Sequence, residues 1–487
     1  MNQTSTGLLR MTDDERPFSK DLKDLFATLI VSLMPFSAHR VRFTKVEYTF
    51  LSENAIQNLG SLKFSQSNRM PDPKDPSRIV TTTATTTFSM SKEMAWSLCQ
   101  LFLDARFFES ADGKQDPEFT MRGTVWQLTP KGISVLDGFC SRNGVQLKQL
   151  SELVGLFTTQ LITLERDAQT DKLFLDQSTV EVIFSRFVGS RRRGVGSRLS
   201  DSTTSWYDSQ AAIGVKTLAE RRVNGRLYQD TFTGKAAVDW LMDYCTIVDI
   251  REAVEILSLF IQHNLMDPSL PDRAYASQNP DCKLFQPTKN ALYTLSQRGK
   301  DLVNPTSLSR TASISMRESP FQRSTLKDSN AHRLDKILSD PTLCLLFREH
   351  LRETHCEENL SFQQEVKEFI RNCKAAMQKL KDSPEDTPAM DRAKELLASS
   401  YGIYNAFLAP GSPREINIDH QLRKNLASRM SKAVAQDIAI GETLQEVTSL
   451  FEDAQVAIFK LMTSDSVPKF LHSPKYTFQV GHAGLHV

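Results

Sequence analysis

A single hydrophobic core cannot account for this chain, because residues 304–330 contain too few apolar side chains to fold by themselves. Upstream of this Ser- and Arg-rich stretch, helix-like and strand-like patterns alternate. From Leu334 onward, apolar residues recur at helical spacing. The chain has 487 residues, and the usual size of about 100 to 200 residues per domain predicts three or four modules.

Charge and cysteine content narrow the class of protein. The net charge of +1 and the sequence pI near 7.6 exclude the basic excess of a general nucleic-acid binder. Seven scattered cysteines without a Cys-x-x-Cys pair favour reduced thiols in the cytosol. The densest apolar run, residues 25–36, is far shorter than the roughly 20 residues that span a bilayer. We therefore expect a cytoplasmic protein without a secretory signal or lipid anchor.

Residues 21–145 have the pattern of a winged-helix module of the α+β class. Ser91 is a typical N-cap for a helix over residues 92–106. Aromatic residues and a Gly/Asp turn follow, and residues 119–128 have the pattern of a strand. Helices closed by a short aromatic hairpin predict a winged helix, preceded by a polar tail at residues 1–20.

Residues 211–303 predict a second winged-helix module. Asp249 and Glu252 form a capping box, in which an N-cap acid is followed three residues later by a second one. The helix that they open has one continuous apolar stripe, which predicts that it packs on a core.

The segment between these modules, residues 146–210, is predicted to contain a helix at residues 147–165 and then a linker. Arginines without neighbouring acids follow among Gly and Ser. Two interpretations stay open, a solvated flexible linker or a contact with an anionic lipid or a phosphorylated tail. The arginines are Arg186, Arg191, Arg192, Arg193 and Arg198.

Residues 331–474 predict a compact all-α bundle, followed by a tail at residues 475–487. Asp340-Pro341 supplies an N-cap and a proline at the first helical position. Short connections between apolar stripes indicate antiparallel neighbouring helices. Six aromatic residues are assigned to the core, namely Phe362, Phe369, Tyr404, Phe407, Phe451 and Phe470.

Polar residues gather at three helix ends of this bundle. The first lies in residues 354–362, where two carboxylates and a carboxamide open a helix. The second lies in residues 415–419 and the third in residues 465–471. Each could simply cap a helix or offset its dipole, or it could contact a partner.

The ordered set of these motifs resembles the regulator of G-protein signalling (RGS) family over about 140 residues. Five motifs carry the resemblance, in the family's order: Glu357-Glu358-Asn359-Leu360 with Phe362, Ile403-Tyr404-Asn405-Ala406-Phe407, Glu415-Ile416-Asn417, Phe451-Glu452-Asp453-Ala454-Gln455, and Leu461-Met462 with Asp465-Ser466. Four positions depart from the family pattern: Cys356 stands in place of a usual serine, Ser361 and Gln363 in place of an acid and a tryptophan, and Lys469 in place of a frequent arginine.

The two upstream modules resemble DEP domains, which are small winged-helix adaptors of signalling proteins. In the second module the resemblance rests on Phe232-Thr233-Gly234 and Val238-Asp239-Trp240-Leu241. The first module resembles the companion DEP-like region of fungal RGS proteins that control development or mating-signal desensitisation. That weaker resemblance rests on Phe107-Phe108, Trp126 and Thr129-Pro130-Lys131-Gly132.

The RGS resemblance implies a negative regulator that accelerates GTP hydrolysis by the GTP-bound α subunit of a heterotrimeric G protein (Gα). Because Gα carries its catalytic arginine in cis, such a protein needs no catalytic chemistry, metal or cofactor of its own. The DEP resemblance implies placement at a receptor tail or at the plasma membrane. By position, the implied Gα contacts are Cys356, Glu357, Glu358, Asn359, Glu415, Asn417, Leu461, Asp465, Ser466 and Lys469.

Other functions fit the sequence less well. It lacks the common phosphate-loop, metalloprotease and serine-hydrolase motifs, which argues against an enzyme. A Gα-binding scaffold that does not accelerate hydrolysis stays open. A winged-helix nucleic-acid binder is disfavoured, because the candidate recognition helix at residues 251–263 has Arg251 as its only lysine or arginine. Finally, Arg310-Thr311-Ala312-Ser313 suits a kinase that prefers an upstream arginine, which makes Ser313 a candidate phosphorylation site.

Overall fold

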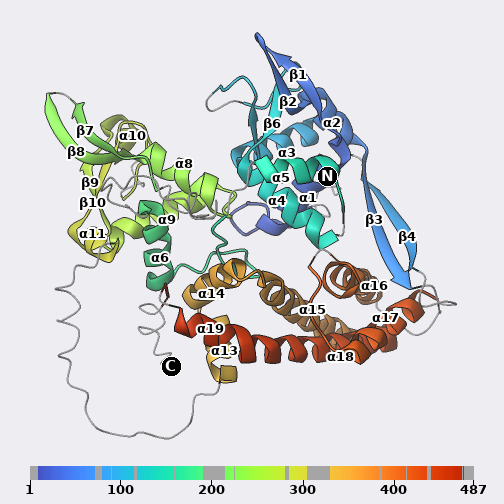
Figure 1. Cartoon of the computed structure of the whole chain (residues 1–487). Coiled ribbons are helices and arrows are strands. Elements are labelled where there is room, and N and C mark those ends of the chain that lie inside the picture. The colour runs from blue at the N-terminus through green and yellow to red at the C-terminus, as the bar shows by residue number, and fades with distance from the viewer. Residues whose placement is uncertain are drawn as a thin grey trace, which may run out of the picture. The chain divides into compact units, whose positions relative to one another are not determined.

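Tertiary contacts divide the chain into two compact units (Figure 1), which a computed structural model describes over most of their length. One unit comprises residues 1–58, 91–135 and 149–325, and the other comprises residues 59–90, 136–148 and 326–487. The described residues are 9–71, 79–88, 90–114, 118–143, 145–156, 161–189, 214–223, 225–279, 284–303, 330–382, 387–412, 414–435, 440–473 and 475–476.

The first module is a winged helix around a four-stranded antiparallel sheet with strand order β1-β2-β6-β5. Trp126 is completely buried in it, and its indole N–H donates to Ser52 Oγ at 2.8 Å. As predicted, Ser91 caps the helix that follows it, accepting from the Met94 amide at 3.2 Å. Its elements are α1 (Ser19–Leu33), β1 (Ser37–Val41), β2 (Thr44–Leu51), α2 (Ser52–Gly60), the paired strands β3 (Leu62–Pro71) and β4 (Ile79–Phe88), α3 (Lys92–Asp104), β5 (Phe108–Ser110), β6 (Val125–Leu128) and α4 (Pro130–Asn143).

The second module repeats this plan with strand order β7-β8-β10-β9. Asp249 accepts from the Arg251 amide at 2.7 Å, which confirms the predicted N-cap. The core also takes in Phe184 and Phe187 from α6, a helix in the segment between the modules. The elements are α6 (Gln177–Val188), β7 (Leu218–Val223), β8 (Arg226–Thr233), α8 (Gly234–Tyr244), α9 (Ile250–Gln262), β9 (Met266–Leu270), α10 (Arg273–Gln278), β10 (Leu292–Leu295) and α11 (Gln297–Val303).

Both modules start their last helix in the same way. In the first, the Thr129 amide donates to Phe107 O at 3.1 Å, and the Gly132 amide donates to Thr129 Oγ1 at 3.0 Å. In the second, the Ser296 amide donates to Leu265 O at 3.1 Å, and the Gly299 amide donates to Ser296 Oγ at 3.0 Å. The shared strand order and helix start give the two modules one fold.

Two sequence-based boundaries are wrong. The helix predicted for residues 147–165 is α5 (Lys148–Leu156), and Ile162 instead lies in a β-bridge with Cys245. Hydrogen bonds from Ile162 and Leu164 to the second module, at 2.8 and 3.0 Å, replace helical ones. The strand predicted for residues 119–128 begins only at Val125, because Gly123 adopts φ +81° in a turn.

The C-terminal unit contains the predicted helical bundle. Asp340 caps α14 by accepting from the Leu343 amide at 3.0 Å, and α15 packs against α16 and α18. All six predicted core aromatics are buried. The elements are α13 (Asn330–Ser339), α14 (Pro341–Glu353), α15 (Glu357–Asp382), α16 (Thr387–Ile403), η1 (Tyr404–Leu408), α17 (His420–Ala435), α18 (Ile440–Leu461), η2 (Met462–Ser466) and α19 (Val467–His472).

Within the described ranges, no helix is long and apolar enough to cross a membrane. The six described cysteines are free, and Cys282 lies outside the described residues.

Candidate functional site

The first predicted contact region is the turn between α14 and α15. His355 adopts φ +54°, which reverses the chain after Thr354 ends α14. Glu357 then opens α15, where a carboxylate offsets the positive end of the helix dipole. Arg352 at the end of α14 donates to both Glu357 oxygens, at 2.8 and 2.9 Å. This bidentate pair ties the two helices together across the turn.

The two adjacent glutamates differ in their electrostatics. Burial raises the pKa of Glu357, but the hydrogen bonds and charge of Arg352 outweigh it, so the net shift is downward. Burial raises the pKa of Glu358, and the neighbouring Glu357 charge adds to that rise. Arg352 therefore stabilises the charge of Glu357, whereas the half-buried Glu358 has a less favourable setting for its charge.

Asn359 is 6% exposed, and its side-chain Oδ1 has no hydrogen-bond partner among the described residues. A buried acceptor without a donor costs about 1 to 3 kcal/mol. The side chain lies at the first turn of α15, beside Glu358. A donor brought by a binding partner would remove that cost.

The second predicted region is the loop before α17. The Ile416 amide donates to Phe407 O at 2.9 Å and the Ile416 side chain is buried, so Asn417 is left exposed next to it. Glu415 accepts from the Gly411 amide at 2.8 Å and pairs with Arg423, which gives it a role inside the loop.

The structure brings the first two regions together. Arg414, next to Glu415, interacts electrostatically with Glu357 and Glu358. Phe407, which anchors the second loop, packs edge-on against Phe362 of α15 with ring centroids 5.6 Å apart. Arg414 was missed at the sequence level, because a single arginine in a Pro/Gly-rich loop gives no signal of its distant partners.

The third predicted region follows α18. Asp465 is exposed and pairs with Lys469 at 2.7 Å, one helical turn later, while Ser466 is buried at 4% exposure. Phe470 anchors this region on α14 by packing edge-on against Phe347, with ring centroids 5.2 Å apart. Leu461 is partly exposed at the end of α18.

The ten predicted contact residues therefore divide by their surroundings. Glu357 and Glu415 have partners inside the domain, and Asn359 and Ser466 are buried. The most accessible of the others are Asn417, Asp465 and Lys469, and those that are partly exposed are Cys356, Glu358 and Leu461. Of the linker arginines, Arg186 lies in the last turn of α6, and Arg191, Arg192, Arg193 and Arg198 lie outside the described residues, as does Ser313.

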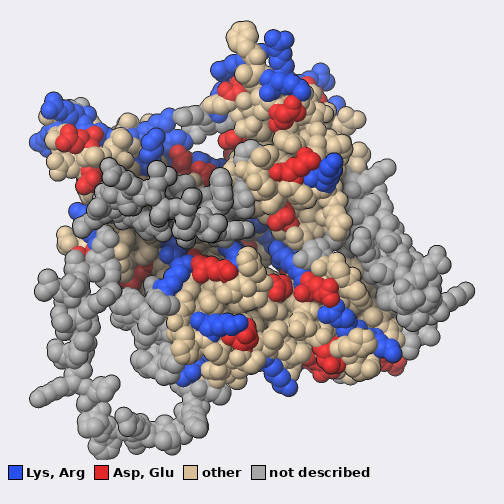
Figure 2. Space-filling model, in the orientation of Figure 1, with Lys and Arg blue, Asp and Glu red and all other residues tan. Residues whose placement is uncertain are grey.

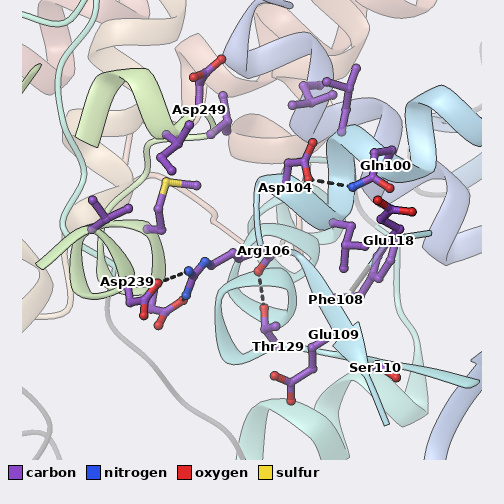
Figure 3. Close-up of a pocket in the computed structure, with 18 of the residues that line it drawn as sticks. Gln100, Asp104, Arg106, Phe108, Glu109, Ser110, Glu118, Thr129, Asp239 and Asp249 are labelled. Carbon is purple, nitrogen blue, oxygen red and sulfur yellow. Dashed lines mark hydrogen bonds and ion pairs between the residues drawn. The ribbon is translucent and has the colours of Figure 1, made fainter. Parts of the chain in front are cut away.

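A second candidate is a cleft of about 930 Å³ in the N-terminal unit, lined by residues of both winged-helix modules. Figure 3 shows Arg106 directed at Asp239, and the same guanidinium donates to Asp243 at 3.0 Å. Gln100 donates to Asp104 at 2.8 Å on another part of the wall. The Arg106 ion pairs link the modules, whereas the Gln100–Asp104 hydrogen bond lies within α3, and the described lining residues form no convergent set of groups for a ligand.

Lys131 also links the modules. It is 2% exposed, and its Nζ donates to Met242 O at 2.5 Å and to Ile247 O at 2.6 Å. Burial, with a smaller effect from the Lys23 charge, lowers the pKa of Lys131 to about 7. Sequence gave no sign of this burial, because a lysine at the start of a helix is ordinarily solvated.

Comparisons with protein families cover most of the chain. Residues 333–478 match the family described as regulator of G protein signaling domain. Residues 216–295 match the domain found in Dishevelled, Egl-10 and Pleckstrin (DEP), and residues 21–156 match the fungal-differentiation regulator winged helix domain.

The chain is also similar to several whole proteins. The chain is 52% identical over 481 residues to the developmental regulator flbA of Emericella nidulans, covering 98% of this chain but 66% of that protein. It is 27% identical to regulator of G-protein signaling 1 of Schizosaccharomyces pombe, covering 96% of this chain and 92% of that protein. Regulator of G-protein signaling 19 of Bos taurus is 28% identical over 146 residues, which are 30% of this chain and 52% of that protein.

Proposed function

Because this chain contains an RGS domain and a DEP domain, we propose that it is a negative regulator of G-protein signalling that accelerates GTP hydrolysis by a Gα subunit. Gα supplies its own arginine and a glutamine that orients the attacking water. The regulator then has only to hold the mobile switch segments in the arrangement of the transition state. Rigid helix ends that carry acidic and carboxamide groups suit that task.

The observation that supports the proposal is the packing of the first two contact regions, because Phe407 accepts from the Ile416 amide and packs on Phe362 of α15. On this basis we propose that the half-buried Glu358 and the buried Asn359, whose Oδ1 lacks a donor among the described residues, form one contact surface with the exposed Asn417. Backbone N–H groups of the switch segments would supply the missing donor for Asn359. The Asn417 carboxamide, which both donates and accepts, suits contact with the Gα glutamine.

Single-turnover GTP hydrolysis by purified Gα, with and without the full chain, tests this activity. Asn417→Ala should reduce the acceleration about a hundredfold, the usual effect of removing one group that acts in the transition state. Asn425→Ala on α17, which removes an exposed asparagine bonded within its own helix, is the matched control and should leave the rate unchanged.

The charge variant Glu358→Lys should abolish the acceleration, whereas Glu395→Lys on α16, at an exposed glutamate paired with Arg392, should not. Full acceleration by both Asn417→Ala and Glu358→Lys would contradict the assigned surface. Tight binding of Gα without any acceleration by the unmodified chain would instead support the scaffold alternative.

Nucleic-acid binding finds no support in α9. Arg251 is paired with Asp249 at 2.8 Å, and the buried Glu252 accepts from Arg166 and Arg16. A phosphate-binding surface needs several free cations.

We also propose that the DEP domain places the protein at the plasma membrane, through a receptor tail or the lipid itself. Deleting residues 211–300 is a poor test, because it would expose Phe184 and Phe187 of α6. Point variants on exposed residues avoid this problem, and the next subsection develops a separate membrane surface on the first module.

A further inference from the structure

The free end of the β1–β2 hairpin differs from an ordinary hairpin turn. The strands pair up to Val41 and Thr44, which leaves Arg42 and Phe43 as a two-residue turn. Arg42 adopts φ +53°, a left-handed conformation that favours Gly, Asn or Asp. The corresponding turn between β7 and β8 has Gly225 at φ +80°. A glycine thus serves at the equivalent turn of the second module, so the winged-helix fold does not itself require Arg42-Phe43 at this turn.

Two further features of this turn also lower hairpin stability. Phe43 is 94% exposed, so its ring lies almost wholly in water. Arg40 lies directly opposite Lys45 in the strand register, and like charges in that position destabilise a hairpin. Residues that lower stability without making a compensating contact are expected at functional surfaces.

The charges around Phe43 are mainly positive. Lys45 is 2.8 Å from Glu47, and Arg42 and Lys114 both interact electrostatically with Asp112. Arg40 forms no ion pair with any residue that the structure describes. Four cations thus face two carboxylates, and Figure 2 shows blue side chains gathered at this end of the N-terminal unit. An exposed aromatic ring within a cationic cluster fits the interface of an anionic bilayer, where aromatic rings lie at headgroup depth.

We propose that the hairpin tip, defined as Arg40, Arg42, Phe43 and Lys45, docks on an anionic lipid bilayer. Phe43 enters the headgroup region, and the three basic side chains bind lipid phosphates. The inference rests on the proposed membrane placement and adds to the DEP domain a second contact in the first module, but it does not depend on Gα activity. One inserted ring gives weak and reversible attachment, so the docking adds to other membrane contacts of the protein.

Cosedimentation of the full chain with vesicles tests the proposal. The unmodified protein should bind vesicles of phosphatidylcholine with phosphatidylserine, and not vesicles of phosphatidylcholine alone. Phe43→Ser should lower the partition about tenfold, as expected for partial loss of a buried aromatic ring. Arg40→Glu should lower it by about fivefold or more, because each basic residue near such a surface contributes about that factor. Phe174→Ser, at another exposed phenylalanine, is the matched control and should have no effect.

Phe43→Trp gives a direct readout of insertion. The variant should keep the full partition, and its emission should shift to the blue only with vesicles that contain phosphatidylserine. Bound protein without that shift would overturn the proposal. An unchanged partition of Phe43→Ser would also overturn it. So would release from vesicles by Leu227→Ser, on the β7–β8 hairpin, when Phe43→Ser causes none.

Two more measurements separate the remaining outcomes. If a soluble acidic peptide binds the unmodified chain and Phe43→Ser equally well and displaces both from vesicles, the tip is a protein-binding surface and the lipid proposal fails. Acceleration of GTP hydrolysis in solution should be the same for all hairpin-tip variants and the unmodified chain. If the unmodified chain gives no acceleration, the proposed Gα activity fails while the vesicle result still stands.

Discussion

Gly132→Ala should destabilise the first module, although alanine is the better helix former. A Cβ at this position would lie 1.8 Å from Phe107 O, and ordinary contact begins near 3.4 Å. The start of α4 and the Phe107 backbone would have to separate by the difference, 3.4 minus 1.8, or about 1.6 Å. That movement would strain the Gly132 amide bond to Thr129 Oγ1, now 3.0 Å long, and the adjoining Thr129 amide bond to Phe107 O.

The expected cost follows from these contacts. Overpacking against backbone, which cannot rotate away, falls near the upper end of its usual range, about 3 kcal/mol. Loss of one hydrogen bond adds about 1 kcal/mol, and the gain in helix propensity returns about 1 kcal/mol. We therefore expect a loss of about 3 kcal/mol in the free energy of unfolding of this module.

Hydrogen exchange of individual amides is the suitable assay, because a chain of several domains does not unfold in two states. The Thr129 amide should exchange about a hundredfold faster in Gly132→Ala. Gly138→Ala in the same helix is the control, since no atom lies within 4 Å of its new Cβ. It should stabilise by about 1 kcal/mol. Equal effects of the two substitutions would refute the reasoning.

Three further predictions concern charge and capping. Lys131→Met should abolish a rise, between pH 7 and 9, in the urea concentration at which the winged-helix modules unfold. With its pKa lowered to about 7 from 10.5, the folded state binds fewer protons than the unfolded state, so stability increases with pH above 7. An unchanged pH profile in this variant would refute the assignment. Glu357→Gln should lower the melting temperature of the RGS domain through loss of about 1 kcal/mol, since its pair with Arg352 is partly solvated. It should reduce Gα acceleration less than Glu358→Lys, and the opposite ranking in single-turnover assays would make Glu357 a direct contact. Asp340→Ala should lower the stability of the RGS domain by about 1 kcal/mol, because it removes the N-cap of α14. A thermal scan should show a lower melting temperature for this variant and no change for the exposed control Glu395→Gln.

The sequence by itself determined the features that depend on near neighbours. Ser91, Asp249 and Asp340 were identified as N-caps, because a cap bonds to an amide only two or three residues away. The core aromatics of the bundle followed from helical spacing. The RGS and DEP motifs could be recognised for a similar reason, since the residues within each motif are contiguous.

Only the tertiary structure decided the features that depend on distant partners. Residues 162 and 164 do not continue the predicted helix, because Ile162 and Leu164 bond to the second module. Lys131 can be buried because two carbonyl oxygens, more than a hundred residues away in the chain, accept hydrogen bonds from its amino group. Phe407 packs on Phe362 and so brings together two contact regions whose motifs lie far apart in the chain. A local pattern contains no information about such partners, because it is the folded chain that brings them within bonding distance.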